Sequence, residues 1–152
     1  MFKINKLTDY STVVMCYLAE APEAVHTAND ICQHTHIALP TVSKILKMLA
    51  KKGLLTSHRG ASGGYQLAKS PQEISVAEIV MAIEGEVGLT ECSMDHSHCN
   101  IQDLCHIRGN WRLISHIVEQ TLQNITLADL AKPMLATDMY ITAIGATHMK
   151  GD

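Results

Sequence analysis

The residues best suited to chemistry lie in one short segment, from Glu91 to Arg108. Thiolates that are grouped closely in a segment of this kind most often bind zinc or an iron–sulfur cluster. A polar loop with incidental thiols is a third interpretation, and the spacing alone does not choose among the three. The segment contains three cysteines, three histidines and two aspartates: Cys92, Cys99, Cys105, His96, His98, His106, Asp95 and Asp103.

The other two cysteines, Cys16 and Cys32, lie far from this segment in the sequence and are predicted to be ordinary small core residues. An odd total of five cysteines suits ligand chemistry better than a disulfide framework. The N-terminal residues lack the apolar stretch of a signal peptide, and no apolar run is long enough to span a membrane. We therefore expect a cytoplasmic protein with reduced thiols and no membrane contact.

The charge of the chain is unevenly distributed. Its 152 residues are 47% hydrophobic and 18% charged, which is typical of one well-packed domain with an appended helix. The net charge is −3, yet the stretch from Pro40 to Lys69 contains six basic residues and no acidic one. The rest of the chain contains six basic and fifteen acidic residues. A basic face on an acidic protein indicates contact with nucleic acid.

Two helices in this region are predicted to form a helix-turn-helix. The first covers 27–35 with Thr27 as its N-cap, and the second begins at Pro40 and ends at Gly53. Apolar residues recur at helical spacing from Val42 to Leu49, and the opposite face is polar and basic. Such a second helix enters the major groove of DNA with its N-terminal residues against the bases. Three residues are predicted to lie at or near the bases and two more at phosphates: Thr41, Ser43 and Lys44, then Lys47 and Lys51.

Two short strands, 54–58 and 65–68, are predicted to follow as a hairpin. The connection from Arg59 to Gly64 contains three glycines, which suit a sharply turned tip. The hairpin is predicted to be the wing of a winged helix, with Arg59 reaching the minor groove or the phosphates. The glycines do not form a phosphate-binding loop, because no Gly-Lys-Ser/Thr ending and no helix follow them.

Further helices are expected at 7–21, 75–84 and 109–124. Thr8 is predicted to cap the first of these, which places Asp9 in its first turn. Ser75 is predicted to cap the second, with Glu78 three residues on. The last has a wide apolar stripe beyond a complete winged-helix core, so we predict a homodimer. The expected fold class is mainly α: a winged helix-turn-helix with a small β-hairpin wing and a long C-terminal dimerisation helix. The predicted divisions are a DNA-binding domain, a cysteine-rich cluster-binding loop, a dimerisation region and a poorly ordered tail: 1–85, 86–108, 109–131 and 132–152.

No enzymatic activity is predicted. No nucleophile is paired with a base and an orienting group, and the pattern places no pair of carboxylates in a cleft. A small-molecule substrate is therefore not expected. Four histidines outside the cysteine segment are interpreted as polar surface residues and not as ligands: His26, His34, His36 and His58.

Five motifs occur in a characteristic order: Lys6–Tyr10, Leu39–Lys44, Arg59–Tyr65, Ala82–Gly85, and the three cysteines before Trp111. Together they resemble the bacterial winged-helix regulators that sense iron–sulfur clusters, a family that includes the isc regulator and the nitric-oxide-sensing repressor NsrR. The start of the chain is most similar to the members that control the SUF iron–sulfur assembly operon. The resemblance implies a homodimeric transcription factor that binds double-stranded operator DNA. It also implies one iron–sulfur cluster per protomer, either 2Fe–2S or 4Fe–4S.

The resemblance further implies that the three cysteines bind the cluster and that another residue completes the site. In the isc-regulator branch this fourth ligand is a histidine three residues beyond the last cysteine, where this chain has Arg108. In the NsrR branch it is an aspartate from the N-terminal segment of the other protomer, and that position corresponds to Asp9. His106 is the rival fourth ligand, as are His96 and His98.

The predicted function is therefore a cluster-sensing transcriptional repressor of genes for iron–sulfur assembly or for the response to redox stress and nitric oxide. Loss or change of the cluster would shift the population between DNA-binding and non-binding dimers. Two alternatives need no cluster. One is a zinc-stabilised winged-helix regulator, and the other is a regulator that switches by oxidation of its thiols.

Overall fold

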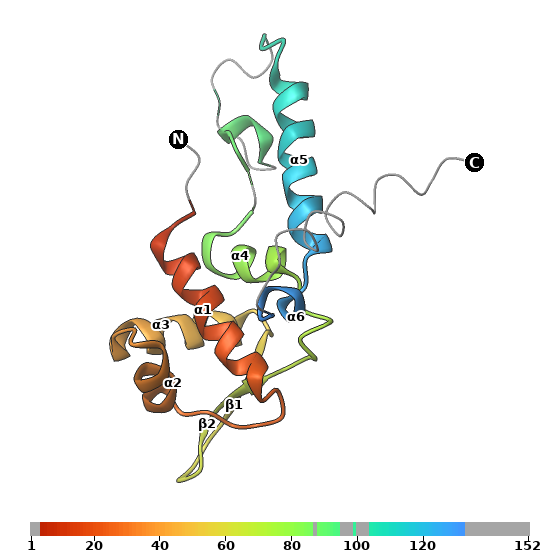
Figure 1. Ribbon diagram of the computed structural model, residues 1–152. Coiled ribbons are helices and arrows are strands. Elements are labelled where there is room, and N and C mark those ends of the chain that lie inside the picture. Colours follow the sequence, from red (N-terminus) through yellow and green to blue (C-terminus); the bar gives the residue numbers. More distant parts are fainter. Residues whose placement is uncertain (1–3, 87, 95–98, 100–103, 133–152) are drawn as a thin grey trace, which may run out of the picture.

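The computed structural model describes residues 4–86, 88–94, 99 and 104–132. Its first four helices and a two-stranded hairpin form one body, and a long helix, α5, extends away from it (Figure 1). The predicted fold class, a mainly helical winged helix with a β-hairpin wing and a long C-terminal helix, is confirmed. The elements in chain order are α1 Lys6–Glu20, α2 Ala28–Thr35, α3 Leu39–Lys51, β1 Leu55–His58, β2 Gly64–Leu67, α4 Val76–Glu84, a 3₁₀ turn Glu91–Ser93, α5 Arg108–Asn124 and α6 Leu127–Leu130.

The core lies where α1, α2, α3 and α4 meet. The apolar residues that recur along α3 are all fully buried, as their spacing predicts: Val42, Ile45, Leu46 and Leu49. Each such side chain contributes roughly 1.5–3 kcal/mol through removal of its apolar surface from water. Val14 and Leu18 of α1 and Ile79 of α4 pack into the same core. Leu127, at the start of α6, is also fully buried there, so the chain returns to the core after α5.

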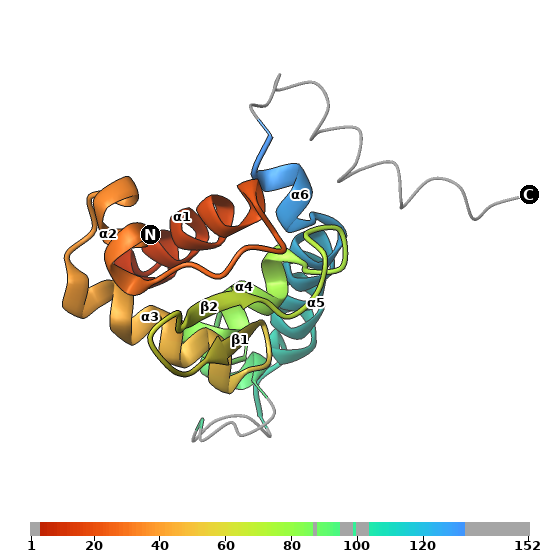
Figure 2. The same cartoon turned by 90° about the horizontal axis from the view of Figure 1, so that it is seen from below.

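The return is fixed by backbone hydrogen bonds to the segment before α4. The Val76 amide donates to the Ile125 carbonyl at 2.8 Å, and the Leu127 amide donates to the Ile74 carbonyl at 2.7 Å. Figure 2 shows α6 beside α1, against which it packs. The C-terminal end of α5 is thus attached to the winged-helix body. Among the helices described, none is both long and apolar enough to cross a membrane. The predicted tail from 133 onwards lies outside the described residues, and the predicted division of the chain into four parts stays a prediction.

Three helices begin with reciprocal capping boxes, in which a side-chain oxygen accepts from the third helical amide and an acidic residue accepts from the capping amide. In α2, Thr27 Oγ1 accepts from the Asp30 amide at 3.2 Å, and Asp30 Oδ2 accepts from the Thr27 amide at 2.9 Å. Ser75 with Glu78 caps α4 in the same way, and Thr126 with Asp129 caps α6. The first two of these helix starts confirm the sequence prediction.

These caps make the stability of the fold sensitive to acid. The hydrogen bonds from Thr27 and Thr126 lower the pKa of Asp30 and of Asp129 below their usual value of 3.8. Burial acts to raise the pKa of Glu78, but hydrogen bonds from Ser75 and Lys69 outweigh it and lower that pKa below 4.5. A lowered carboxyl pKa stabilises the folded state fully above the unfolded value, and this contribution disappears as pH falls through the lower folded value.

We therefore expect the urea midpoint of unfolding to be nearly constant from pH 7 to pH 5 and to fall below about pH 4.5. The measurement is urea unfolding followed by circular dichroism across this range. The triple variant Asp30→Asn, Glu78→Gln, Asp129→Asn should start from a lower midpoint at pH 7 and lose less between pH 5 and pH 3. An equal loss in the variant and the parent would show that other groups cause the acid sensitivity.

The start of α1 differs from the prediction. Asn5, not Thr8, caps the helix, because Asn5 Oδ1 accepts from the Leu7 amide at 2.8 Å. Thr8 is fully buried, and its hydroxyl donates to Glu84 Oε1 at 2.5 Å. The Asn5 amide donates to the same carboxylate oxygen at 3.1 Å. Glu84, the last residue of α4, thus holds the start of α1 next to Gly85, from which the chain leads to the cysteine segment.

Candidate DNA-binding surface and cysteine segment

The exposed face of α3 carries the predicted DNA contacts. Its buried stripe orients the helix, so that Lys44, Lys47 and Lys51 all lie exposed on the outer side, while Thr41 and Ser43 are half-buried. Pro40 lies in the first turn, no side chain caps the helix, and no acidic residue occupies that turn. The positive end of the helix is therefore unoccupied by protein side chains, which favours an anion such as a DNA phosphate.

The predicted wing is present and is held to the body at its base. Strands β1 and β2 pair antiparallel with Leu55 opposite Leu67, and both leucines are buried. At the tip, Gly60 has a φ of 108°, and a Cβ at Gly63 would lie 2.6 Å from the His58 carbonyl oxygen. The tip conformation therefore requires glycine, and it leaves Arg59 exposed. In Figure 1 the hairpin projects below the helical body.

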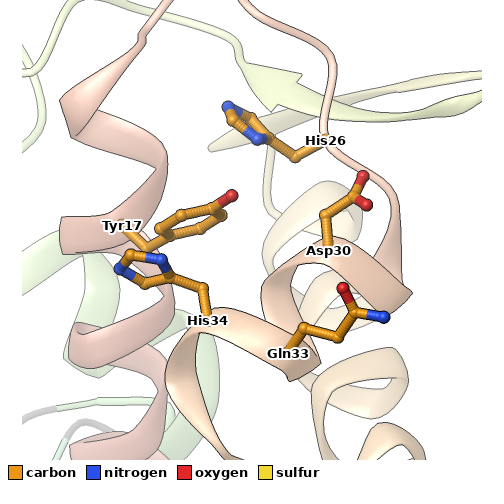
Figure 3. A pocket seen from close by; sticks show the side chains of 5 residues that line it. All are labelled: Tyr17, His26, Asp30, Gln33 and His34. Carbon is orange, nitrogen blue, oxygen red and sulfur yellow. The ribbon is translucent and has the colours of Figure 1, made fainter.

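His26 and Tyr65 attach the wing to the segment between α1 and α2. Their backbones exchange hydrogen bonds of 2.9 and 2.8 Å. The His26 ring also lies edge-on to Tyr17, with centroids 5.0 Å apart, and His34 stacks on the same tyrosine at 4.3 Å (Figure 3). The surface interpretation is therefore wrong for His26, whose ring is partly buried and whose Nε2 has no hydrogen-bond partner in the described part of the chain.

This aromatic contact fixes α2 relative to α1 and to the wing, and so it orients the helix-turn-helix. With Asp30 and Gln33 these three residues line an open pocket (Figure 3). Sequence reasoning missed the contact because it joins α1, the connecting segment and α2, and no spacing rule links residues across elements. The interpretation as exposed residues is confirmed for His34, His36 and His58.

The positive charges on this surface are not neutralised by the protein. Within the described segments, no carboxylate lies within 4.0 Å of the Lys44, Lys47 or Lys51 ammonium or of the Arg59 guanidinium. Lys69, at the end of the acid-free stretch, is different, because its Nζ lies 3.0 Å from Glu78 Oε1. A charge that already has a partner offers less to an incoming phosphate. The unpaired positive charges of α3 and of the wing tip are therefore the ones available to a phosphate.

The cysteine segment connects α4 to α5. Cys92 is buried in the 3₁₀ turn, and its Sγ lies 3.2 Å from Thr90 Oγ1. Cys99 and Cys105 are half-buried. Asp95, His96, His98 and Asp103 lie outside the described residues. Among the residues that are described, no three histidine, cysteine or acidic side chains are close enough to hold a metal ion. The grouping of the three thiols as ligands therefore stays a prediction.

The first part of the segment is packed against α5. The Leu89 amide donates to Ser115 Oγ at 3.1 Å, and Ser115 is almost fully buried. Met94 covers Gly88 so closely that a side chain at Gly88 would collide with it. Figure 1 shows the 3₁₀ turn alongside the N-terminal half of α5. The helix α5 therefore positions Cys92.

The second part of the segment leads into the start of α5. The Arg108 amide donates to the Cys105 carbonyl at 3.4 Å, and this bond closes one turn between the two residues. Arg108 is half-buried, and its Nε has no hydrogen-bond partner in the described structure. No side chain caps α5, and no acidic residue lies in its first turn. This end of the helix is therefore positively charged, which suits an anionic donor set such as three thiolates.

The candidate fourth ligands lie on the surface. Asp9 is exposed in the first turn of α1, and its carbonyl accepts from Thr12 Oγ1 at 2.7 Å. His106 is exposed next to Cys105. Exposure of both side chains leaves them accessible to a partner protomer or to a neighbouring loop. The choice between them is a prediction that the single chain does not test.

A helix-turn-helix with an unpaired basic face, followed by a hairpin wing, defines a winged-helix DNA-binding protein. A family model described as Rrf2, iron-dependent transcriptional regulator, matches residues 4–133. The chain belongs to this family. It is a DNA-binding transcriptional regulator and not an enzyme, as predicted.

Relatives within the family have different names. The chain is 30% identical to protein rrf2 of Nitratidesulfovibrio vulgaris over 86% of this chain and 87% of that protein. It is 36% identical to the regulator IscR of Serratia proteamaculans over 66% of this chain and 61% of that one. Among solved structures, CymR, the global cysteine regulator of B. subtilis, superposes with a TM-score of 0.67 at 27% identity, covering 86% of this chain and 97% of CymR. IscR of T. potens superposes with a TM-score of 0.63 at 28% identity, covering 91% and 96%.

Proposed function

We propose that this regulator is a homodimeric repressor that senses an iron–sulfur cluster held between α4 and α5. The observation that supports it most directly is the combination of three cysteines in one segment with the positively charged, uncapped start of α5 beside Cys105. Soft thiolates select iron–sulfur clusters or zinc, and a nearby positive charge favours the anionic thiolate over the thiol. The donor set therefore fits a cluster.

In this proposal Cys92, Cys99 and Cys105 hold the cluster, and Asp9 of the partner protomer or His106 completes the site. When bound, the cluster supplies redox chemistry and an iron that is open to oxygen or nitric oxide. The chain supplies the packing of Cys92 against α5 and the start of α1 that Glu84 fixes beside Gly85. The relatives named IscR and NsrR support a cluster, and the SUF assembly genes are the proposed targets.

The proposed homodimer explains the uncovered apolar residues of α5 and of the turn before it. These side chains have no place in the core of the single chain, and Leu104 is 82% exposed. A second copy would bury the same surface on both protomers, as a two-fold interface requires. The exposed residues are Leu104, Ile107, Leu113, Ile114 and Ile117.

In this proposal the hydrogen bonds of Glu84 couple the cysteine segment to the DNA-binding unit. Its carboxylate accepts from Asn5 and Thr8 of α1, and α4 ends at Glu84, where the chain turns towards the cysteines. A change in the order of the segment 86–108 therefore acts on both α4 and α1. Both helices pack against the core that carries α3. The population of dimers that is competent to bind DNA would shift accordingly.

A zinc-stabilised or thiol-based regulator is the second candidate. The likeness to a structure described as a global cysteine regulator supports it, because the family fold is shared by proteins with other signals. The buried Cys92 beside Thr90 also suits a structural site. This candidate keeps the same DNA-binding surface and changes only the sensor.

The two candidates are separated by the absorption spectrum of protein purified without oxygen, with analysis of iron, sulfide and zinc. The expected result is a visible absorption band with iron and sulfide in comparable amounts. A colourless protein that contains zinc, or one without metal that also resists cluster reconstitution, would refute the cluster. If such a protein still bound duplex DNA, the second candidate would be supported.

A further inference from the structure

Two side chains of the wing form a chain of hydrogen bonds that crosses it from strand to strand. His58 is the last residue of β1 and directly precedes Arg59. Thr56 pairs with Gln66 in the register of the hairpin, so His58 and Gln66 are diagonal neighbours on the same face. His58 Nε2 lies 3.1 Å from Gln66 Oε1, and Gln66 Nε2 donates to the backbone carbonyl of Glu23 at 3.0 Å.

The carbonyl of Glu23 fixes the direction of both bonds. A carbonyl oxygen can only accept, so Gln66 must present its NH2 group to Glu23, and its own oxygen then faces His58. His58 must therefore donate from Nε2. The neutral Nε2–H tautomer and the protonated imidazole both have this donor, so the chain of bonds forms with either.

These bonds tie the outer strand of the wing to the helix-turn-helix. Within the described structure, β1 pairs through its backbone with β2 alone. Glu23 lies beyond the other side of β2, in the segment 21–27 that connects α1 to α2, and His26 of this segment forms the backbone bridge to Tyr65. Gln66 therefore joins His58, at the end of β1 nearest the tip, to the segment that leads into α2.

The link acts at the place where the wing must be rigid. A two-stranded hairpin is only marginally stable on its own, and Arg59 is exposed at its tip. A contact residue that is held in place before binding loses less conformational freedom when it meets DNA. Because the two bonds lie at the surface, they contribute little to the stability of the whole fold.

We infer that His58 and Gln66 are positioning residues for the contact of Arg59 with DNA. Gln66 holds His58 to the connecting segment, and His58 fixes the backbone from which the Arg59 side chain extends. This inference concerns the DNA-binding surface alone, so it goes beyond the proposed sensor and is the same for a cluster, zinc or thiols. It rests on the predicted contact between Arg59 and DNA.

The variant Gln66→Met tests the inference, because it keeps the length of the side chain and removes both bonds. We expect the affinity for a fluorescently labelled duplex of mixed sequence, measured by anisotropy, to fall roughly three- to tenfold. His58→Leu removes the donor and should cause a similar loss. His58→Gln should restore the affinity, since its NH2 lies as many bonds from Cα as Nε2 of histidine does. Thr56→Val, opposite Gln66 in the register, should bind as the parent does.

Two double variants separate positioning from direct contact. In an Arg59→Ala background, Gln66→Met should cause no further loss, because the residue that it positions is gone. His58→Leu combined with Gln66→Met should lose no more than either change alone. A further loss in this second pair would overturn the inference, since His58 would then contact DNA itself. Unchanged affinity in Gln66→Met, or in Arg59→Ala, would overturn it as well.

A purely structural role is recognised from the unfolding of the same proteins. It would lower the urea midpoint of Gln66→Met and reduce affinity equally with and without Arg59, and this result would also overturn the inference. Each variant is compared with the parent at the same metal content. Failure of the proposed sensor appears in the absorption spectrum and does not alter these comparisons, so the two proposals fail separately.

Discussion

Replacing any one of Cys92, Cys99 or Cys105 with serine is expected to abolish the visible absorption of the anaerobically purified protein. A cluster that loses one of three thiolate ligands has only oxygen or nitrogen donors in its place, and these bind iron more weakly. The protein should stay folded, since the described core of the winged helix contains none of these three residues. Absorbance at visible wavelengths, with iron and sulfide content, is the measurement.

The chain supplies its own controls for this experiment. Cys16 and Cys32 are half-buried in α1 and α2, far from the cysteine segment in the sequence, and both pack against the core. Burial and the neighbouring Glu20 raise the pKa of the Cys16 thiol, which disfavours the thiolate that a metal requires. Cys16→Ser and Cys32→Ser should keep the full absorption. Retention of the band in all three segment variants would show that the ligands have been assigned to the wrong residues.

The second large effect concerns DNA. The double variant Lys44→Glu, Lys47→Glu is expected to lower affinity for duplex DNA on the order of a hundredfold, because two exposed positive charges on the predicted DNA-binding face become negative and repel the DNA. The dependence of log affinity on log salt should also become shallower by about one for each phosphate contact that is lost. Fluorescence anisotropy with a labelled duplex, measured between 50 and 200 mM salt, follows both quantities.

Lys69→Glu is the matched control for this variant. Lys69 belongs to the same acid-free stretch and is also exposed, but its ammonium is already paired with Glu78 at 3.0 Å. Its replacement should change DNA affinity much less than the double variant does. Equal losses in the two proteins would indicate that general charge, and not the face of α3, determines binding.

The fold was predictable where short-range rules decide the structure. Thr27 and Ser75 were recognised as caps because the acidic partner lies three residues later, within one turn of helix. The burial of Val42 and Leu49 followed from helical spacing. The same spacing predicts the polar, basic face of α3, because that face lies opposite the buried stripe and is therefore exposed.

The parts that could not be predicted join residues that are distant in the sequence. Thr8 fits the rule for a capping residue, but Glu84 lies 76 positions away and draws it into the core. The stacking of Tyr17 with His26 and His34 depends on how two helices and a connecting segment meet.

The attachment of α5 at one end has a mechanical consequence. Its C-terminal end is clamped to the body by the bonds between the Ile74–Val76 and Ile125–Leu127 segments, whereas its N-terminal end, beside the cysteines, extends beyond the body (Figure 1). A helix of 17 residues is about 25 Å long, so a tilt of about 5° at the clamp moves its far end by about 2 Å. The helix is therefore held at its C-terminal end, and its N-terminal end has more room to move. In the proposed regulator, a displacement of about 2 Å at the cysteines would become a small rotation of the DNA-binding unit, and it would change the orientation of α3 relative to the major groove.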